Sequence, residues 1–214
     1  MTLKQRVLRG VGWSTASRVA QQIAQLAIAV VMMRLLSPDD YGLIGMATVF
    51  IGFAALFSEL GLSAAVVQRE TLNELQLSSV FWLNMFLGIL LSLVFFLLAP
   101  TLSMFFERPE LQSIVQVLSV TFTITALALL PKTLLQKEME FQRLAAVEVA
   151  ALLVSAPTAL FLAYQGWAVW ALVAQQLVSA TANMVGAWIA KPPAVQFRFS
   201  YKAVRDILGY GANL

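Results

Sequence analysis

Six long apolar stretches, separated by short polar links, constrain the fold of this chain more than any other feature of its sequence. They cover residues 11–36, 41–60, 77–99, 111–130, 144–164 and 167–190. A helix crosses the hydrocarbon core of a bilayer with roughly 20 mostly apolar residues, because its backbone hydrogen bonds are then satisfied internally. Six such helices use about 120 residues of the chain. We therefore predict an all-α, polytopic membrane protein with six transmembrane helices.

The composition excludes several other classes of protein. Only 12% of the residues are charged, against about 25% in a typical soluble domain. The chain contains no Cys and no His, which excludes thiol nucleophiles, Cys/His zinc sites and histidine acid–base catalysis. It also lacks the glycine-rich phosphate loop of ATP-hydrolysing proteins. We expect no enzyme activity, no metal, no cofactor and no nucleic-acid partner.

The positions of Lys and Arg predict the orientation of the helices. With a cytoplasmic N-terminus and alternating helices, eleven of these residues lie on the cytoplasmic side and only Arg34 and Arg108 lie in outer loops. The eleven are Lys4, Arg6, Arg9, Arg69, Lys132, Lys137, Arg143, Lys191, Arg198, Lys202 and Arg205. Such an excess is typical of cytoplasmic loops. It predicts a multi-pass protein of the bacterial inner membrane whose N-terminus is cytoplasmic.

The stretches divide the chain into two parts. Residues 1–190 form the expected six-helix transmembrane lobe. Residues 191–214 begin with Lys191 and two prolines and continue as a cytoplasmic link, which leads into the start of a seventh helix near residue 201. Because that helix has only begun at Leu214, the sequence predicts that the chain is truncated.

Polar residues form a stripe along the first predicted helix. Ser14, Arg18, Gln22 and Gln25 are spaced by four, four and three residues, so they share one helical face. A face with a cation and several amides is unfavourable against lipid and suits the wall of a water-filled cavity. The alternative is that the first two turns lie among the lipid headgroups and that Arg18 extends its charge to the interface.

Two charges of the first helical pair are predicted to lie at a similar depth. Arg18 precedes Leu36 by about 27 Å of helix, and Glu59 follows Asp40 by about 28 Å. Because the two helices are antiparallel, Arg18 and Glu59 either pair with each other or both line an inner vestibule. The alternative is two separate interfacial charges.

Three further helices carry polar side chains. Glu148 and Asn84 fall in the cytoplasmic halves of their helices, and a carboxylate within a span is a functional candidate by default. The alternative for Glu148 is an inner-edge charge near Arg143. The sixth helix has a polar stripe, for which we expect hydrogen bonds between helices. The stripe comprises Gln175, Ser179 and Asn183.

Four segments resemble one known family. Residues 34–42 (RLLSPDDYG) are similar to the first outer turn of polysaccharide flippases, and residues 59–69 (ELGLSAAVVQR) to the end of their second helix. The opening GVGWS and the segment from FSY to LGYG near the C-terminus are similar as well. The chain therefore resembles the Wzx-type O-antigen and exopolysaccharide exporters of the multidrug/oligosaccharidyl-lipid/polysaccharide superfamily. The colanic-acid-exporter-like branch is the nearest.

The resemblance implies a function. Such exporters move an oligosaccharide, linked to undecaprenyl diphosphate, to the outer leaflet by alternating access between two six-helix lobes, driven by an ion gradient (H+ or Na+). This chain matches the N-terminal lobe, so the C-terminal lobe is missing or supplied by another chain. Arg18 matches the cationic cavity of the superfamily. The expected partners are the lipid-linked oligosaccharide and membrane lipids.

Three alternatives to this function remain at the level of sequence. The chain could export drugs or small molecules as another member of the superfamily, or be an inactive or assembly half-transporter. A membrane enzyme such as a glycan polymerase is disfavoured, because its catalytic groups would need sizeable outer loops and these are short.

Overall fold

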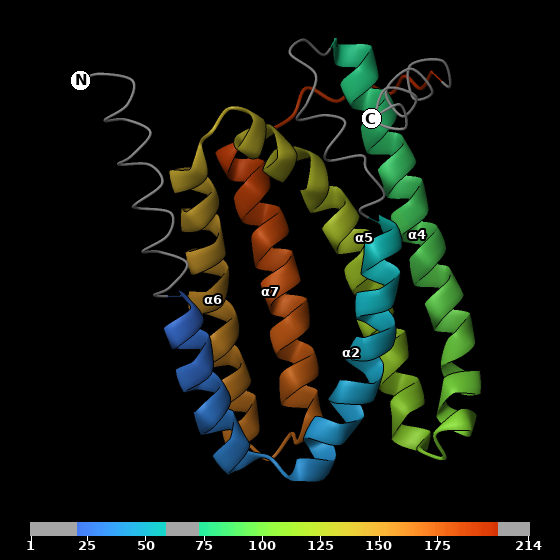
Figure 1. Cartoon of the computed structure of the whole chain (residues 1–214), viewed down its shortest axis with the longest axis vertical. Coiled ribbons are helices and arrows are strands. Elements are labelled where there is room, and N and C mark those ends of the chain that lie inside the picture. The colour runs from blue at the N-terminus through green and yellow to red at the C-terminus, as the bar shows by residue number, and fades with distance from the viewer. Residues whose placement is uncertain (1–20, 59–72, 201–214) are drawn as a thin grey trace.

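The computed structural model describes residues 21–58 and 73–200. Within these ranges the chain forms helices and contains no β-strand, which confirms the all-helical prediction. The helices are Gln21–Leu35, α2 (Pro38–Ser58), α4 (Glu74–Phe105), α5 (Pro109–Lys137), α6 (Phe141–Tyr164) and α7 (Val169–Ala190). Figure 1 shows them running up and down as a bundle.

Three of these helices, α4, α5 and α6, are long and apolar enough to cross a membrane by length and composition. The 22-residue α7 is long enough, but its amide side chains reduce its apolar character. The number of six transmembrane helices stays a prediction. The candidate spans nevertheless place the described bundle among membrane proteins, as the composition predicts.

Two helices extend beyond the apolar stretches that predict them. The third stretch was expected to end at residue 99, before Pro100, but α4 continues through this proline to Phe105. The fourth was expected to end at Leu130, with a charged stretch from Lys132 after it, but α5 continues through Pro131 to Lys137. A proline removes one backbone hydrogen bond, and a membrane helix tolerates this where neighbouring groups satisfy the freed carbonyl. Lys132 therefore belongs to a helix.

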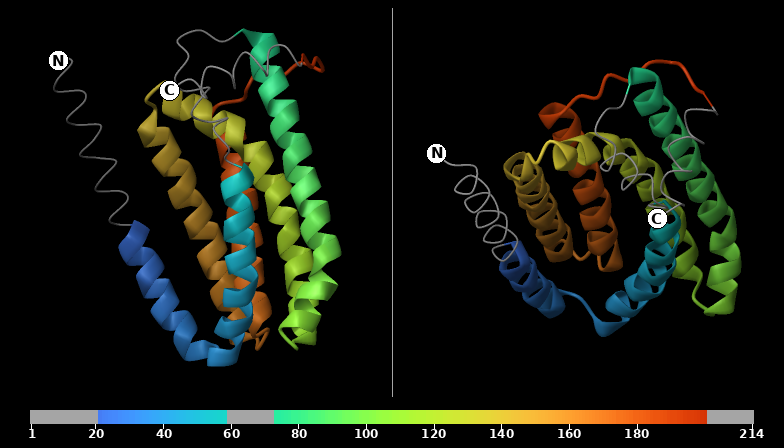
Figure 2. Two further views of the ribbon diagram at one scale, coloured as in Figure 1. Left: turned by 45° about the vertical axis from the view of Figure 1, so that its right-hand side comes forward. Right: turned by 45° about the horizontal axis from the view of Figure 1, so that its top comes forward.

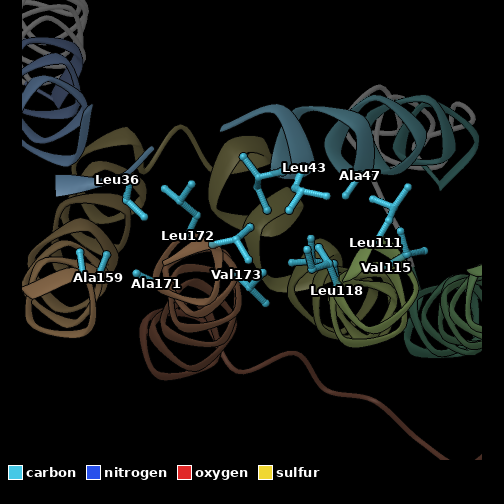
Figure 3. Close-up of a cluster of buried hydrophobic side chains, with 14 of the residues drawn as sticks. Leu36, Leu43, Ala47, Leu111, Val115, Leu118, Ala159, Ala171, Leu172 and Val173 are labelled. Atoms are coloured by element: carbon cyan, nitrogen blue, oxygen red, sulfur yellow. The ribbon is translucent and has the colours of Figure 1, made fainter. Parts of the chain in front are cut away.

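The apolar core lies at the end of the bundle that carries three turns, residues 36–37, 106–108 and 165–168. Leu36 and Leu43 flank the first turn, and they pack with side chains from α5, α6 and α7 (Figure 3). Leu118 and Val173 are almost fully buried there. Figures 1 and 2 show the helix Gln21–Leu35 beside α6, and α2 beside α5. This end of the bundle is consequently dry and well packed.

Two adjacent aspartates tie the three turns together. Asp40 accepts hydrogen bonds from the backbone N–H of Ser37 (2.9 Å) and from that of Val169 (3.0 Å), so it caps the starts of both α2 and α7. Asp39 forms a bidentate ion pair with Arg108, which precedes α5. The hydrogen bond from the Arg108 guanidinium holds the pKa of the Asp39 carboxyl below its usual value. The pair is therefore ionised at neutral pH.

Helices α4 and α5 approach each other closely at Gly88. A Cβ atom built on Gly88 would lie 2.5 Å from the Cβ of Ala126 and 2.9 Å from the carbonyl oxygen of Phe122. Four residues earlier, the side-chain amide of Asn84 donates a hydrogen bond of 2.9 Å to the carbonyl oxygen of Ala126. A small residue and a buried polar residue thus define this helix–helix contact, as is common in membranes.

We predict that Gly88→Ala destabilises the fold by about 1–3 kcal/mol, because the added methyl group overpacks the α4–α5 contact. Gly45→Ala in α2 is the matched control, since its Cβ meets nothing within 4 Å and alanine favours a helix over glycine. Unfolding of the two variants in detergent measures the difference. A Gly88→Ala variant as stable as Gly45→Ala would contradict the close approach.

We predict that Asp40→Ala lowers the free energy of unfolding by about 1–2 kcal/mol, because two helix starts lose their cap. The amide of Val169 should also exchange its hydrogen faster, and hydrogen-exchange mass spectrometry of the α7 start detects this. Glu110→Ala is the control, because this exposed acid has only a 3.8 Å contact with Arg108. Unchanged exchange at the start of α7 would show that Asp40 does not cap it.

Candidate functional site

Beyond the apolar core, the bundle forms a partly open cavity of about 560 Å³, called the polar cavity here because polar side chains predominate among its lining residues. Four helices contribute to its wall: Gln21–Leu35, α5, α6 and α7. Most of the lining side chains carry an amide, a hydroxyl or an ammonium group. The lining residues are Gln25, Thr121, Thr125, Ala128, Leu129, Lys132, Leu152, Ser155, Gln175, Gln176, Ser179, Ala180 and Asn183.

The change from dry core to polar cavity occurs within a few residues on each helix. On α5 the core residue Leu118 is followed by Thr121, which lines the cavity. On α7 the core residue Val173 is followed by Gln175. The cavity thus lies on the far side of the core from the three turns. The core separates it from the turn end of the bundle.

Lys132 supplies the positive charge of the cavity, and within residues 21–58 and 73–200 it is the only charged residue that lines it. Its Nζ donates a hydrogen bond of 2.8 Å to Oδ1 of Asn183, and Nδ2 of Asn183 donates one of 2.9 Å to the carbonyl oxygen of Ser179. An ammonium group has three donors, so two remain for a ligand or water. The α7 stripe was expected to form hydrogen bonds between helices, and Asn183 forms one through Lys132.

Several neutral polar groups of the cavity are also available to a ligand. The side-chain amides of Gln25, Gln175 and Gln176 make no hydrogen bond with any part of the chain that the structure describes. The Thr125 hydroxyl instead donates to the carbonyl oxygen of Thr121 at 2.8 Å, and keeps its acceptor lone pairs. Amides and hydroxyls beside one ammonium suit a ligand that combines many hydroxyls with a negative charge.

Glu148 lies on α6 and is half-buried, and it does not line the cavity. Within the described ranges it forms no ion pair shorter than 4 Å. Its carboxylate nevertheless acts electrostatically on the Lys132 ammonium. Glu148 is thus a nearby counter-charge rather than a direct partner, and a negative ligand would compete with it for Lys132.

The other predicted site residues lie in different places. Gln22 is exposed and does not line the cavity, whereas its neighbour Gln25 does. Asn84 is buried in the α4–α5 contact, with its amide bonded to Ala126. Arg18 and Glu59 lie outside the described residues, so their predicted pairing is not tested.

Lys132 was not among the residues singled out from the sequence, where it was placed in a cytoplasmic loop. A signal was present: Thr121, Thr125 and Lys132, with the small Ala128 between them, are spaced by four, three and four residues. This spacing puts them on one helical face. This shared face can be recognised in the sequence only if the helix is predicted to continue through Pro131.

Helices of membrane length around a cavity with polar side chains are the features of a polytopic membrane protein. Comparison with known families identifies it further: residues 31–214 match the family described as polysaccharide biosynthesis protein. The chain belongs to this family, which confirms the resemblance to Wzx-type exporters noted from its motifs.

Curated relatives agree with this assignment. The lipopolysaccharide biosynthesis protein WzxC of Escherichia coli is 28% identical over 72% of this chain and 31% of its own length. The succinoglycan biosynthesis transport protein ExoT of Rhizobium meliloti is 27% identical over 92% of this chain and 40% of its own length. The teichuronic acid biosynthesis protein TuaB of Bacillus subtilis is 26% identical over 99% of this chain and 44% of its own length. The chain spans less than half the length of these relatives, and no solved structure matches it.

Proposed function

We propose that this chain forms one lobe of an exporter that moves undecaprenyl-diphosphate-linked oligosaccharide across the bacterial inner membrane during polysaccharide or lipopolysaccharide biosynthesis. The polar cavity around Lys132 carries this proposal, because it offers an ammonium and unpaired amides inside an apolar bundle. The names of the relatives, which include a transport protein for succinoglycan biosynthesis, support it.

The chemistry of the cavity fits the head of such a substrate. The two free donors of the Lys132 ammonium can bind phosphate oxygens, and hydrogen bonds between charged partners are roughly twice as strong as neutral ones. Gln175 and Gln176 can both donate to and accept from sugar hydroxyls. We therefore assign the diphosphate to Lys132 and the first sugars to the α7 amides.

The position of the cavity fits a mechanism of alternating access. The predicted topology places the three turns, and with them the dry core, on the outer side. The cavity then lies in the cytoplasmic half, where it can receive a substrate assembled in the cytoplasm. Release on the outer side requires a second lobe against which this one rocks. The greater length of the relatives leaves room for such a lobe.

The residues predicted from the sequence enter the proposal in distinct roles. Arg18 is proposed as a second phosphate ligand, since a guanidinium binds phosphate in a bidentate manner. Gln22 shares its predicted face, and Glu59 is its proposed partner. Asn84 holds α4 against α5. Glu148 is proposed as the carboxylate that binds the coupling ion, H+ or Na+. If the complete exporter with Glu148→Gln still needed the ion gradient for transport, this role would be contradicted.

Export of a cationic drug is the weaker alternative. A cationic solute needs carboxylates or exposed aromatic faces to offset its charge. Among the described residues that line the cavity none is acidic or aromatic, and the one charged group is the Lys132 ammonium. The lining therefore favours an anionic or neutral sugar-containing solute.

We predict that Lys132→Gln weakens binding of undecaprenyl diphosphate by about 10- to 100-fold, the factor expected when hydrogen bonds to a charged group are lost. The chain in lipid nanodiscs is titrated with this lipid and binding is measured by calorimetry. Lys137→Gln is the matched control, because Lys137 lies one turn further along α5 and does not line the cavity. The same assay with Arg18→Ala measures how much Arg18 contributes to the affinity for undecaprenyl diphosphate.

Two results would contradict the proposal. Equal affinity of the wild-type chain and Lys132→Gln would remove Lys132 from the phosphate site. Equal weakening by Lys132→Gln and Lys137→Gln would indicate a general effect of positive charge at the membrane surface rather than a site in the cavity.

A further inference from the structure

A second recess lies between α5 and α7, and it is apolar. It has a volume of about 400 Å³ and is lined by Leu127, Met184, Val185, Trp188 and Ile189. Met184, Val185, Trp188 and Ile189 fall on the side of α7 that is turned away from Asn183, so this apolar groove and the polar cavity occupy different faces of the helix. The groove is therefore separate from the site proposed for the oligosaccharide.

Trp188 gives the groove a fixed wall. Its indole Nε1 donates a hydrogen bond of 2.9 Å to the carbonyl oxygen of Leu127 on α5. Its ring also contacts Phe81 of α4 edge to face, with centroids 6.0 Å apart. A side chain held by both a hydrogen bond and an aromatic contact keeps one rotamer, so the groove is a preformed feature of the bundle.

The segment that follows α7 lies against the start of α4. Residues 191–200, here called the strap, run from the end of α7 to the start of α4 (Figure 1). The backbone N–H of Gln196 donates to the Ser78 hydroxyl at 2.8 Å, and Nε1 of Trp82 donates to the carbonyl oxygen of Gln196 at 3.0 Å. Phe197 packs on Trp82 at 5.2 Å between ring centroids. Trp82 in turn contacts Phe81, whose ring contacts Trp188, so a chain of aromatic contacts joins the strap to the wall of the groove.

The length of α4 places the strap at the level of the lipid headgroups. Its 32 residues span about 48 Å at 1.5 Å per residue, whereas the hydrocarbon core is about 30 Å thick. Trp82 lies about 35 Å along the helix from Phe105. With Phe105 at the opposite interface, the strap crosses α4 just outside the hydrocarbon.

The strap presents both aromatic rings and a cation to its surroundings. Phe197 is 93% exposed and Phe199 is 55% exposed. Arg198 between them is exposed, and it forms no salt bridge within residues 21–58 and 73–200. Lys191, in contrast, pairs with Glu138 at 2.6 Å. Aromatic side chains next to a free cation are typical of a surface that contacts anionic headgroups.

We propose that groove and strap together bind one anionic phospholipid of the surrounding membrane. An acyl chain occupies the groove against Trp188, and the phosphate of the headgroup pairs with Arg198. Phe197 and Phe199 lie in the interfacial region beside it. The bound lipid joins α5, α7 and the strap, and it does not depend on which solute the polar cavity takes.

The test is native mass spectrometry of the chain released from bilayers of equal parts phosphatidylglycerol and phosphatidylethanolamine. We expect one retained phospholipid per chain, with phosphatidylglycerol preferred about five-fold, as one basic residue at an anionic surface implies. Arg198→Gln should abolish the preference, whereas Arg143→Gln, an exposed cation at the same end of the bundle, should leave it intact. Ile189→Gln, at a groove position that is 78% exposed, should lower total retention without unfolding the chain.

Several outcomes would overturn the proposal. Retention of no lipid by a folded wild-type chain would exclude the site. Equal effects of Arg198→Gln and Arg143→Gln on the phosphatidylglycerol preference would show that the preference arises from general surface charge. Retention of a polyisoprenoid lipid in place of phospholipid would assign the groove to the transported substrate. Because Lys132→Gln should not change phospholipid retention, failure of this proposal and failure of the oligosaccharide site are distinguishable.

Discussion

The cost of a positive charge inside a membrane-length helix governs the layout of this lobe. Lys132 lies within α5 near its predicted cytoplasmic end, and its ammonium is half-buried between helices, where a charge needs polar partners. The hydrogen bond to Asn183 supplies one partner, and the amides and hydroxyls of the cavity keep the surroundings polar. One cluster of buried apolar side chains lies at the turn end of the bundle, and further apolar residues, among them Phe81, Leu135 and Val147, are buried toward the opposite end. The lobe thus has an apolar core at its turn end and, beyond that core, a cavity with polar side chains that can receive a ligand.

The apolar core depends in turn on the two aspartates of the first turn. Asp40 caps α2 and α7, and Asp39 pairs with Arg108 before α5, so three helices that carry core residues are anchored at one place. These aspartates belong to the motif on which the family resemblance partly rests. The motif therefore has a structural role in this chain, and the groups that suit substrate binding lie elsewhere, toward the opposite end of α5 and α7. The residues that carry the family resemblance are therefore not the residues that line the cavity.

Much of the fold follows from apolar runs and turn residues, whereas much of the site does not. Hydrophobic length predicts the helices, and the turn between α6 and α7 is found where the apolar stretches 144–164 and 167–190 meet. Lys132 was missed because the fourth helix was predicted to end with its apolar stretch at residue 130, whereas α5 continues through Pro131 to Lys137. Asn84 was interpreted as a cavity candidate, but its partner is a carbonyl of α5, 42 residues away in sequence. Contacts of this kind depend on helix packing, which local patterns do not encode.

The central claim is that Lys132 receives the diphosphate, and a distance measurement tests it most directly. The chain, with nitrogen-15 in its lysine side chains, is placed in bilayers with undecaprenyl diphosphate, and nitrogen–phosphorus dipolar recoupling is measured by solid-state NMR. The Lys132 signal is assigned by its loss in Lys132→Gln. The account predicts a phosphorus atom about 4 Å from Nζ of Lys132, as an ordinary hydrogen bond to a phosphate oxygen implies. Dephasing of the Lys137 or Lys191 nitrogen signal by phosphorus instead, or of no lysine signal, would contradict this claim.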